Sequence, residues 1–276
     1  MIRPLTTLDE CRQVAALEKA VWEFTDGEDV VPPSLLIVSI KRGGLLLGAF
    51  DDAGTLLGFV YSMPGVKEGR LMHWSHMLGV VPGARGTGLG LRLKLAQRDH
   101  VLRAGADLIE WTFDPLQALN AHLNFARLGV VVEEYDEDVY GCSTSPLHLG
   151  TPTDRFVAEW RLTAPHVERR ILLPVASLIR DSSVLSAVPV NQAREKGEWL
   201  ESSRPLLDAS ERRLLVEIPI DFTEMQRRAP ELAMEWRLAT RSVFETYFRR
   251  GYRAVDFFLS REARRGQYLL ALRTET

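Results

Sequence analysis

Apolar and polar residues in the first part of the chain recur first with the period of an α-helix and then with the alternation of a β-strand. Behind a short strand at Ile2–Leu5, the residues Thr7-Leu8-Asp9-Glu10 have the spacing of a capping box, and apolar residues follow at helical intervals (Val14, Leu17, Ala20 and Val21). A second helix is predicted from Pro32-Pro33-Ser34. The apolar runs Gly44–Phe50 and Thr55–Ser62 flank a turn and predict a hairpin.

The middle of the chain continues as an alternation of strands and helices. A strand at Leu71–Val81 enters a glycine-rich turn, from which a helix runs to about Arg103. We predict a short buried strand at Leu108–Phe113, a helical segment over 116–128 that stops at the C′ glycine Gly129, and strands at Val130–Glu134 and Phe156–Leu162. The predicted order over residues 1–162 is therefore β-α-α-β-β-β-α-β-α-β-β.

The pattern changes after residue 162. A polar stretch at Asp181–Ser203 predicts a linker or long loop, followed by a strand at Arg213–Ile220, a long helix from about Glu224 to Arg250, and strands at Arg253–Leu259 and Gln267–Leu272. Two segments echo earlier ones: Glu217–Asp221 lines up with Glu110–Asp114, and Tyr247–Tyr252 with Phe125–Val130. The echo suggests a degenerate second copy of the preceding unit, and coincidence is the alternative.

Length and composition are those of a globular protein with two domains of ordinary size. The chain has 276 residues, of which 46% are hydrophobic and 26% charged, and we place the domains at 1–162 and 163–276. No apolar run approaches the roughly 18 residues of a membrane span. The first residues, MIRPLTTLDECRQ, lack the apolar core of a secretion signal. We expect a cytoplasmic protein without membrane association.

Charge and cysteine content exclude several classes of partner. A net charge of −3 argues against a nucleic-acid-binding surface, because phosphate backbones select basic stripes. Two cysteines, Cys11 and Cys142, provide neither a disulfide framework nor a zinc cluster. Charge is uneven, with 13 basic and 19 acidic residues in 1–150 against 21 and 18 in 151–276. The C-terminal part is therefore mildly basic.

The stretch Val80-Val81-Pro82-Gly83-Ala84-Arg85-Gly86-Thr87-Gly88-Leu89-Gly90 is the most informative motif. An apolar strand runs into a glycine-rich turn that opens a helix, and such a turn holds a phosphate or pyrophosphate through backbone N–H groups. The nucleotide P-loop is disfavoured because its lysine and hydroxyl are missing, and the dinucleotide fingerprint because Leu93 stands in place of the third glycine. A surface turn that merely caps its neighbours is the alternative.

The register that fits, R-x-x-G-x-G from Arg85 through Gly88 to Gly90, resembles the coenzyme A loop of the GNAT N-acetyltransferase superfamily. The resemblance covers residues 1–162 and implies an α/β (α+β) fold with a mixed, mostly antiparallel sheet flanked by helices, followed here by a half-GNAT-like α/β extension. It implies that two neighbouring parallel strands splay apart. Main-chain groups of Leu78, Gly79 and Val80 would then hold pantetheine, and N–H groups of Arg85, Gly86, Thr87, Gly88, Leu89 and Gly90 the pyrophosphate.

Candidate catalytic residues follow from this resemblance and from strand periodicity. The attacking amine must be neutral, so a base near pKa 7 is useful. Period-two alternation places His76 on one face with Leu78 and Val80, and His73 on the other; His76 is the preferred base, although a bulge would reverse this parity. Asp114 closes the next strand, where it would orient the acceptor ammonium or assist the base; an ordinary strand-end or helix-capping aspartate is the alternative.

The remaining site residues come from the resemblance and from residue chemistry. Asn120 matches an asparagine that contacts pantetheine, and Trp111 would lie beside the thioester. Phe125 stands where the family often has a tyrosine that protonates the leaving thiolate, and phenylalanine cannot donate a proton. Tyr140, in the loop after the next strand, is the substitute that we predict, with a purely structural tyrosine as the alternative. Arg237 and Arg241, one helical turn apart, would clamp a carboxylate, with a solvated helix face as the alternative.

A closer resemblance, to long bacterial GNAT proteins, is carried by Ser75–Val80, Trp111–Leu116 and Asn120–Asn124. Some of these proteins are linked to N-acylation of amino acids, including N-succinylation. The resemblance implies transfer of an acyl group from acetyl-CoA or succinyl-CoA to a small-molecule amine by direct attack, with no metal. The rivals are an acyl-CoA-binding sensor or scaffold, a protein or peptide N-acetyltransferase and, more weakly, a nucleotide-binding domain. A homodimer is among the expectations.

Overall fold

The structure, a computed structural model, describes residues 1–24, 29–141, 150–172 and 186–273. The chain divides into two compact units. Unit 1 comprises Met1–Trp111 and Arg161–Thr163, and unit 2 comprises the other described residues after Trp111. This division differs from the boundary that we place after residue 162, which stays a prediction about domains.

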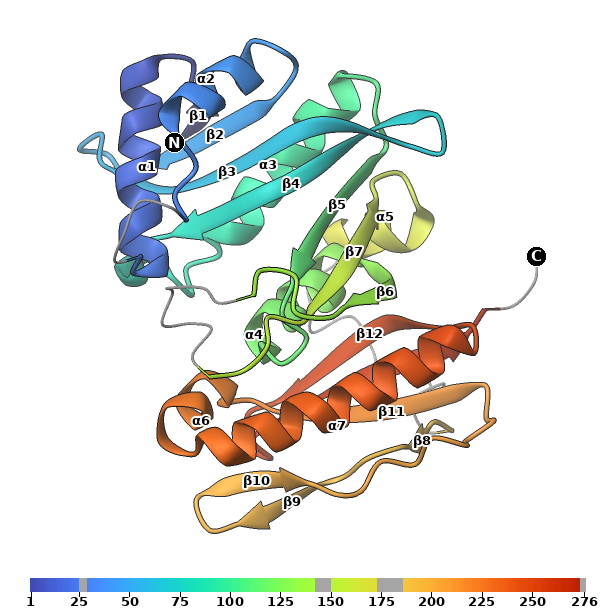
Figure 1. The fold of residues 1–276 in the computed structure, drawn as a ribbon. Helices are drawn as coiled ribbons and strands as arrows, with labels where there is room; N and C mark the ends of the chain where they lie inside the picture. The colour runs from blue at the N-terminus through green and yellow to red at the C-terminus, as the bar shows by residue number, and fades with distance from the viewer. Residues whose placement is uncertain (25–28, 142–149, 173–185, 274–276) are drawn as a thin grey trace. The chain divides into compact units, whose positions relative to one another are not determined.

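Unit 1 is a sheet with helices on both faces (Figure 1). Its strands lie in the order β1-β2-β3-β4-β5, antiparallel except for the parallel pair β4–β5. The elements are β1 (Ile2–Pro4), α1 (Leu8–Trp22), α2 (Pro33–Ile40), β2 (Leu45–Phe50), β3 (Leu56–Lys67), β4 (Arg70–Val80), η1 (Pro82–Ala84), α3 (Leu89–Arg103) and β5 (Leu108–Phe113), whose last two residues belong to unit 2.

The two faces of this sheet have separate apolar cores. α1 begins with the predicted capping box, in which the Glu10 N–H donates to Thr7 Oγ1 and the Thr7 N–H donates to the Glu10 carboxylate. On one face of the sheet, residues of α1 and α2 (Cys11, Val14 and Leu36) pack against residues of β3 and β4 (Phe59, Tyr61 and Met77). The start of α3 packs on the other (Val60, Ala84, Leu89 and Leu93, with Leu78 and Val80 beside them).

Unit 2 contains strands in the order β7-β6-β12-β13-β11-β8, with a separate two-stranded β9–β10 hairpin. Its elements are α4 (Ala118–Ala121), the π-helix η2 (His122–Leu128), β6 (Val131–Asp136), β7 (Arg155–Arg161), α5 (Pro165–Leu172), β8 (Val188–Pro189), β9 (Ala193–Lys196), β10 (Trp199–Ser202), β11 (Arg213–Pro219), α6 (Phe222–Arg228), α7 (Pro230–Arg249), β12 (Tyr252–Ser260) and β13 (Arg265–Leu272). The last residue of β7 belongs to unit 1.

Two predictions about this part of the chain are wrong, and one element was missed. Within the predicted linker Asp181–Ser203, residues 186–203 contain β8, β9 and β10, and residues 181–185 lie outside the described part. The predicted long helix is two helices, because the Ala229 N–H ends α6 by donating to the Met225 carbonyl and Pro230, which has no N–H, opens α7. The short helix α5 was not predicted at all.

The predicted internal echo is matched in the strand pairing of unit 2. Gly129 and Gly251, which the echo makes equivalent, both have positive φ after a helix. At the same spacing Val132 is equivalent to Ala254, and these two residues pair with each other where β6 meets β12. The β6–β7 register shifts just after Val132, and the β12–β13 register shifts just after Ala254. The two segments therefore repeat the same bulged hairpin about a local two-fold axis.

Candidate functional site

The glycine loop folds as a single turn of 3₁₀ helix followed by two left-handed glycines. Gly86 has φ +78° and Gly88 φ +81°, and an added Cβ at either position would meet no atom within 4 Å. Gly88 is the N-cap of α3 and provides no side-chain cap, so the first N–H groups of the helix have no intrahelical acceptor. The loop therefore presents unshielded N–H groups to an approaching anion.

Arg85 braces this loop rather than contributing its own amide. Its N–H donates to the Pro82 carbonyl at 3.2 Å, which removes it from the predicted set of pyrophosphate donors. Its guanidinium donates to the Val80 carbonyl at 3.2 Å and to the Val21 carbonyl at 3.3 Å. The predicted anion site is accordingly left to the N–H groups of residues 86–90.

The parallel ladder between β4 and β5 is short. It consists of two residue pairs, His73 with Ile109 and Trp74 with Glu110, while β4 continues to Val80. Gly79 pairs with Phe59, and the Val81 N–H donates to the Leu57 carbonyl of the β3 side. Because main-chain groups alternate along a strand, Leu78 and Val80 direct theirs to the β5 side.

This alternation corrects the prediction for Gly79. Its main-chain groups face β3 and are not available to pantetheine. The glycine has a packing reason instead, since a Cβ there would lie 2.8 Å from the Phe59 ring and 3.3 Å from the Trp22 ring. The predicted free strand edge therefore consists of Leu78 and Val80, with the Val80 carbonyl already accepting from Arg85.

A β-bulge at His76 overturns the parity argument for this residue. β4 pairs Ser75 with Ser62 and Met77 with Tyr61, so His76 is the extra residue. Its ring lies edge-on to the Tyr61 ring at 6.1 Å, on the α1 and α2 face, whereas Leu78 and Val80 face α3. The imidazole is exposed, yet partial burial lowers its pKa. Its role as a base stays a prediction.

Sequence reasoning missed a buried polar cluster on the other face of β4. Lys94 of α3 is 2% exposed and donates to Ser75 Oγ at 2.8 Å, and Gln97 Nε2 donates to the same oxygen at 3.1 Å. The Lys94 ammonium lies 3.6 Å from the Trp111 ring centroid. Burial lowers the pKa of Lys94 well below its ordinary value. Its position beside Leu93, within the apolar stripe of α3, is the signal that could have revealed it.

Glu18 is a second buried group that was missed. It lies one helical turn after Val14 on the apolar face of α1 and is 1% exposed. One carboxyl oxygen accepts the Val31 N–H at 3.1 Å, and the other has no hydrogen-bond partner. Burial raises its pKa to about 7, so the group is poised to change its charge near neutral pH.

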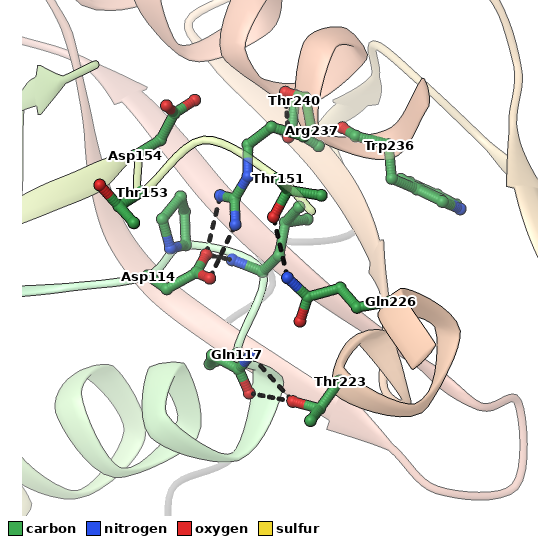
Figure 2. Close-up of polar contacts among 12 residues, drawn as sticks. Asp114, Gln117, Thr151, Thr153, Asp154, Thr223, Gln226, Trp236, Arg237 and Thr240 are labelled. Carbon is green, nitrogen blue, oxygen red and sulfur yellow. Dashed lines mark hydrogen bonds and ion pairs between the residues drawn. The ribbon is translucent and has the colours of Figure 1, made fainter. Parts of the chain in front are cut away.

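In unit 2, Asp114 is bound by an arginine of the same chain. Figure 2 shows its carboxylate facing Arg237 of α7, which donates to both oxygens at 2.8 and 2.7 Å. One oxygen also accepts the Leu116 N–H at 2.8 Å. Although burial opposes its charge, the Arg237 guanidinium holds the pKa of Asp114 below its usual value. The catalytic role predicted for Asp114 has no free carboxylate oxygen to support it.

Arg237 and Arg241 are one turn apart on α7, as predicted, but both are engaged within the chain. Arg237 is 1% exposed and bound to Asp114. Arg241 donates to both oxygens of Asp154 at 2.8 and 2.7 Å and to Glu137 at 2.5 Å. A substrate carboxylate would have to displace one of these partners, so the clamp stays a prediction that this geometry does not favour.

The candidates for the proton donor differ in their surroundings. Phe125 is fully buried in an aromatic cluster, with Phe113 at 6.3 Å and Tyr268 at 5.6 Å between ring centroids. Tyr140 is 48% exposed, and its hydroxyl lies 3.1 Å from the Thr112 hydroxyl on β5. An accessible hydroxyl at that strand keeps Tyr140 as the predicted acid.

The structure groups the predicted residues in two sets. Unit 1 contains the loop, the β4 edge, His76 and the buried Trp111. Unit 2 contains Asp114, Tyr140, Phe125, the two arginines and Asn120. The Asn120 side chain is exposed, and its oxygen accepts a hydrogen bond from Asn124 at 3.4 Å.

Cys142 lies outside the described residues. Among the residues described, no three His, Cys, Asp or Glu side chains are grouped to hold a metal ion. No helix in that part of the chain is long and apolar enough to cross a membrane.

Comparisons with known proteins gave structural likenesses only. Neither a protein-family model nor a curated protein matches the sequence. A GNAT-family protein from Desulfovibrio desulfuricans is 16% identical, with 59% of this chain and 98% of that chain covered and a TM-score of 0.46. A GNAT-family acetyltransferase from Streptococcus pneumoniae is 17% identical, with 58% and 97% covered and a TM-score of 0.47.

The agreement with the predicted fold rests on the chain's own elements. Residues 2–161 follow the predicted order of strands and helices. The parallel β4–β5 ladder stops early, β4 carries a bulge, and its end leads through a left-handed glycine turn into a helix. These features agree with the fold that the R-x-x-G-x-G motif implies. The chain has the fold of the GNAT superfamily.

Proposed function

We propose that the chain is a CoA-dependent N-acyltransferase that moves an acetyl or succinyl group from acyl-CoA to the amine of a small molecule. Amino acids are among the candidate acceptors. The reaction forms a bond between the amine nitrogen and the acyl carbon and breaks the carbon–sulfur bond. The nitrogen loses a proton and the leaving thiolate gains one. The donor needs a site for an extended amide-bearing arm next to a site for a pyrophosphate.

The observation that carries this proposal is the continuity of β4 with the glycine loop. Leu78 and Val80 have main-chain groups on a side where the ladder to β5 has already ended. A few residues later, Gly86 and Gly88 leave open space beside the N–H groups at the start of α3. A strand edge followed by an anion cradle matches pantetheine followed by pyrophosphate.

The chemical roles are assigned to exposed groups. His76 is proposed as the base, because its imidazole is exposed and its lowered pKa leaves it neutral at pH 7. Tyr140 is proposed as the acid, because its hydroxyl is accessible beside the Thr112 hydroxyl. The acyl donor is a substrate, and no metal enters the scheme.

The test is thiol release from acetyl-CoA and succinyl-CoA with D- and L-amino acids and polyamines, together with calorimetric titration of CoA. Gly88→Ala is expected to weaken CoA binding at least tenfold, because it strains the loop and covers its N–H groups. Gly54→Ala is the matched control: its φ is +82° with no atom within 4 Å, and it lies in the β2–β3 turn of the same unit. Equal CoA affinity in the two variants would refute the loop assignment.

One observation favours a second function, an acyl-CoA-binding sensor without catalysis. Phe125 fills the position of the family's proton-donating tyrosine and is sealed among aromatic rings. The sensor predicts CoA binding without thiol release for every amine tested. Loss of turnover in Tyr140→Phe with unchanged CoA affinity would instead favour the enzyme.

A further inference from the structure

Lys94 is a buried lysine at a position where an apolar side chain would be expected. It lies beside Leu93 on the face of α3 that packs against the sheet, and it is 2% exposed. Its hydrogen-bonded cluster is itself buried, since Ser75 is 5% and Gln97 0% exposed. Among the residues that the structure describes, no carboxylate forms an ion pair with Lys94, and burial alone shifts its pKa. A methionine would fill this space at lower desolvation cost.

The position of the Lys94 amine along the sheet suggests why a lysine is buried there. The β4–β5 ladder ends at the pair of Trp74 with Glu110, so the next residues along the two strands are Ser75 and Trp111. Lys94 Nζ donates to Ser75 Oγ at 2.8 Å and lies 3.6 Å from the Trp111 ring centroid. One side chain therefore contacts both strands at the first position where they no longer pair.

Strand separation at this point has to be maintained against the tendency of the ladder to extend. Each further backbone hydrogen bond between β4 and β5 would stabilise the paired arrangement of the two strands. A hydrogen bond to one strand and a contact with the ring of the other hold both side chains on α3 and oppose this extension. Gln97, which donates to Ser75 Oγ at 3.1 Å, fixes the serine from the next turn of the same helix.

We propose that Lys94 is a positioning residue that holds β4 and β5 apart, so that the main-chain groups of Leu78 and Val80 stay available to the pantetheine arm of the acyl donor. This inference rests on the proposed function and deepens it, because it names the side chain that maintains the donor groove. The residue acts through the strands and makes no contact with the reacting atoms.

Lys94→Met tests the inference, since it keeps the length of the side chain and removes the amine. We expect the Kd for CoA and the KM for acyl-CoA to rise about tenfold, with kcat within about threefold of wild type. Ser75→Ala should act in the same direction more weakly, and the double variant should be no worse than Lys94→Met alone. Lys41→Met, an exposed lysine after α2, is the control and should leave all three constants unchanged.

The outcomes separate this inference from the proposed function. If the wild-type protein binds no CoA, both fail. If the wild type binds CoA and a folded Lys94→Met variant binds it equally well, this inference alone is overturned. A loss of kcat at unchanged KM would also overturn it, because that result places Lys94 in the chemical step. If Lys94→Met does not fold, the KM of Ser75→Ala decides, and an unchanged value refutes the proposal.

Discussion

The two units of the molecule differ in how they treat buried charge. In unit 2, each buried charged side chain among the described residues has an opposite charge beside it: Asp114 with Arg237, Asp154 with Arg241, and Glu217 with Arg265. In unit 1, Glu110 is paired with Lys67, but Glu18 and Lys94 have no ion-pair partner in the described part of the chain.

This difference distinguishes buried charges that stabilise the fold from buried charges that are candidates for a functional role. Two of these pairs, those made by Arg237 and Arg241, tie the helix α7 to the segments after β5 and before β7. Hydrogen bonds from α6 reach the same two segments, between Thr223 and Gln117 and between Gln226 and Thr151 (Figure 2). The helices α6 and α7 thus brace these two segments. The uncompensated groups of unit 1 lie where structure alone does not require them, which is typical of groups kept for function.

Arg237→Met tests the contrast between the two units most directly and has the largest expected effect on stability. It leaves the Asp114 carboxylate buried without its counter-ion, and such a loss costs about 3–5 kcal/mol. Urea unfolding at pH 7 measures it. Arg249→Met, at an exposed position of the same helix, should change stability by less than about 0.5 kcal/mol.

A double variant tells whether the pair supports the fold by its charge or only by its packing. Asp114→Leu combined with Arg237→Met removes both charges and should recover most of the loss, because neither partner is then left unpaired. A loss below about 1 kcal/mol for Arg237→Met alone would mean that water reaches Asp114, and the contrast between the units would disappear.

Glu18→Gln tests the other side of the comparison. Burial raises the pKa of Glu18 from 4.5 to about 7, so between these values the folded protein holds a proton that the unfolded chain has lost. The stability due to this proton is complete below pH 4.5 and is lost as the pH rises through 7. Glutamine cannot ionise, so the variant should gain up to about 3 kcal/mol over wild type between pH 5 and pH 8.

The measurement is the free energy of unfolding of both proteins across that pH range. Asp9→Asn, at an exposed carboxylate on the same helix, is the control and should follow the wild-type profile. A constant difference between Glu18→Gln and wild type would show that the pKa of Glu18 is the same in the folded and unfolded protein, and would contradict the effect of burial on this carboxylate.

Local patterns were enough to predict most of the fold. The capping box of α1, the bounds of β5 and the helix stop at Gly129 are set by neighbours in sequence, and each was predicted. The break between α6 and α7 also has a local cause, since Pro230 could have been read as a helix start. The glycine loop was predictable because its turn needs glycine at positive φ whatever surrounds it.

The rest depended on contacts between residues far apart in sequence. The bulge at His76 exists because β4 and β3 pair with unequal residue counts, and no pattern within β4 encodes that count. Asp114 looked available because its partner Arg237 lies on α7, 123 residues further along the chain. Trp111 was predicted to lie beside the thioester, and only the packing of α3 shows Lys94 over its ring.

Lys67→Met has the smallest expected effect. The Lys67–Glu110 pair lies in unit 1, but its buried carboxylate has a cationic partner, as the buried carboxylates of unit 2 do. Glu110 is 6% exposed, but the Lys67 side chain is 32% exposed, so water screens the pair. We expect a loss of about 1 kcal/mol that shrinks in 1 M salt, measured by urea unfolding at both ionic strengths. A loss as large as that of Arg237→Met, insensitive to salt, would place Glu110 with the shielded carboxylates of unit 2. The contrast would then concern Glu18 and Lys94 alone, which strengthens the case that these two groups are kept for a purpose other than stability.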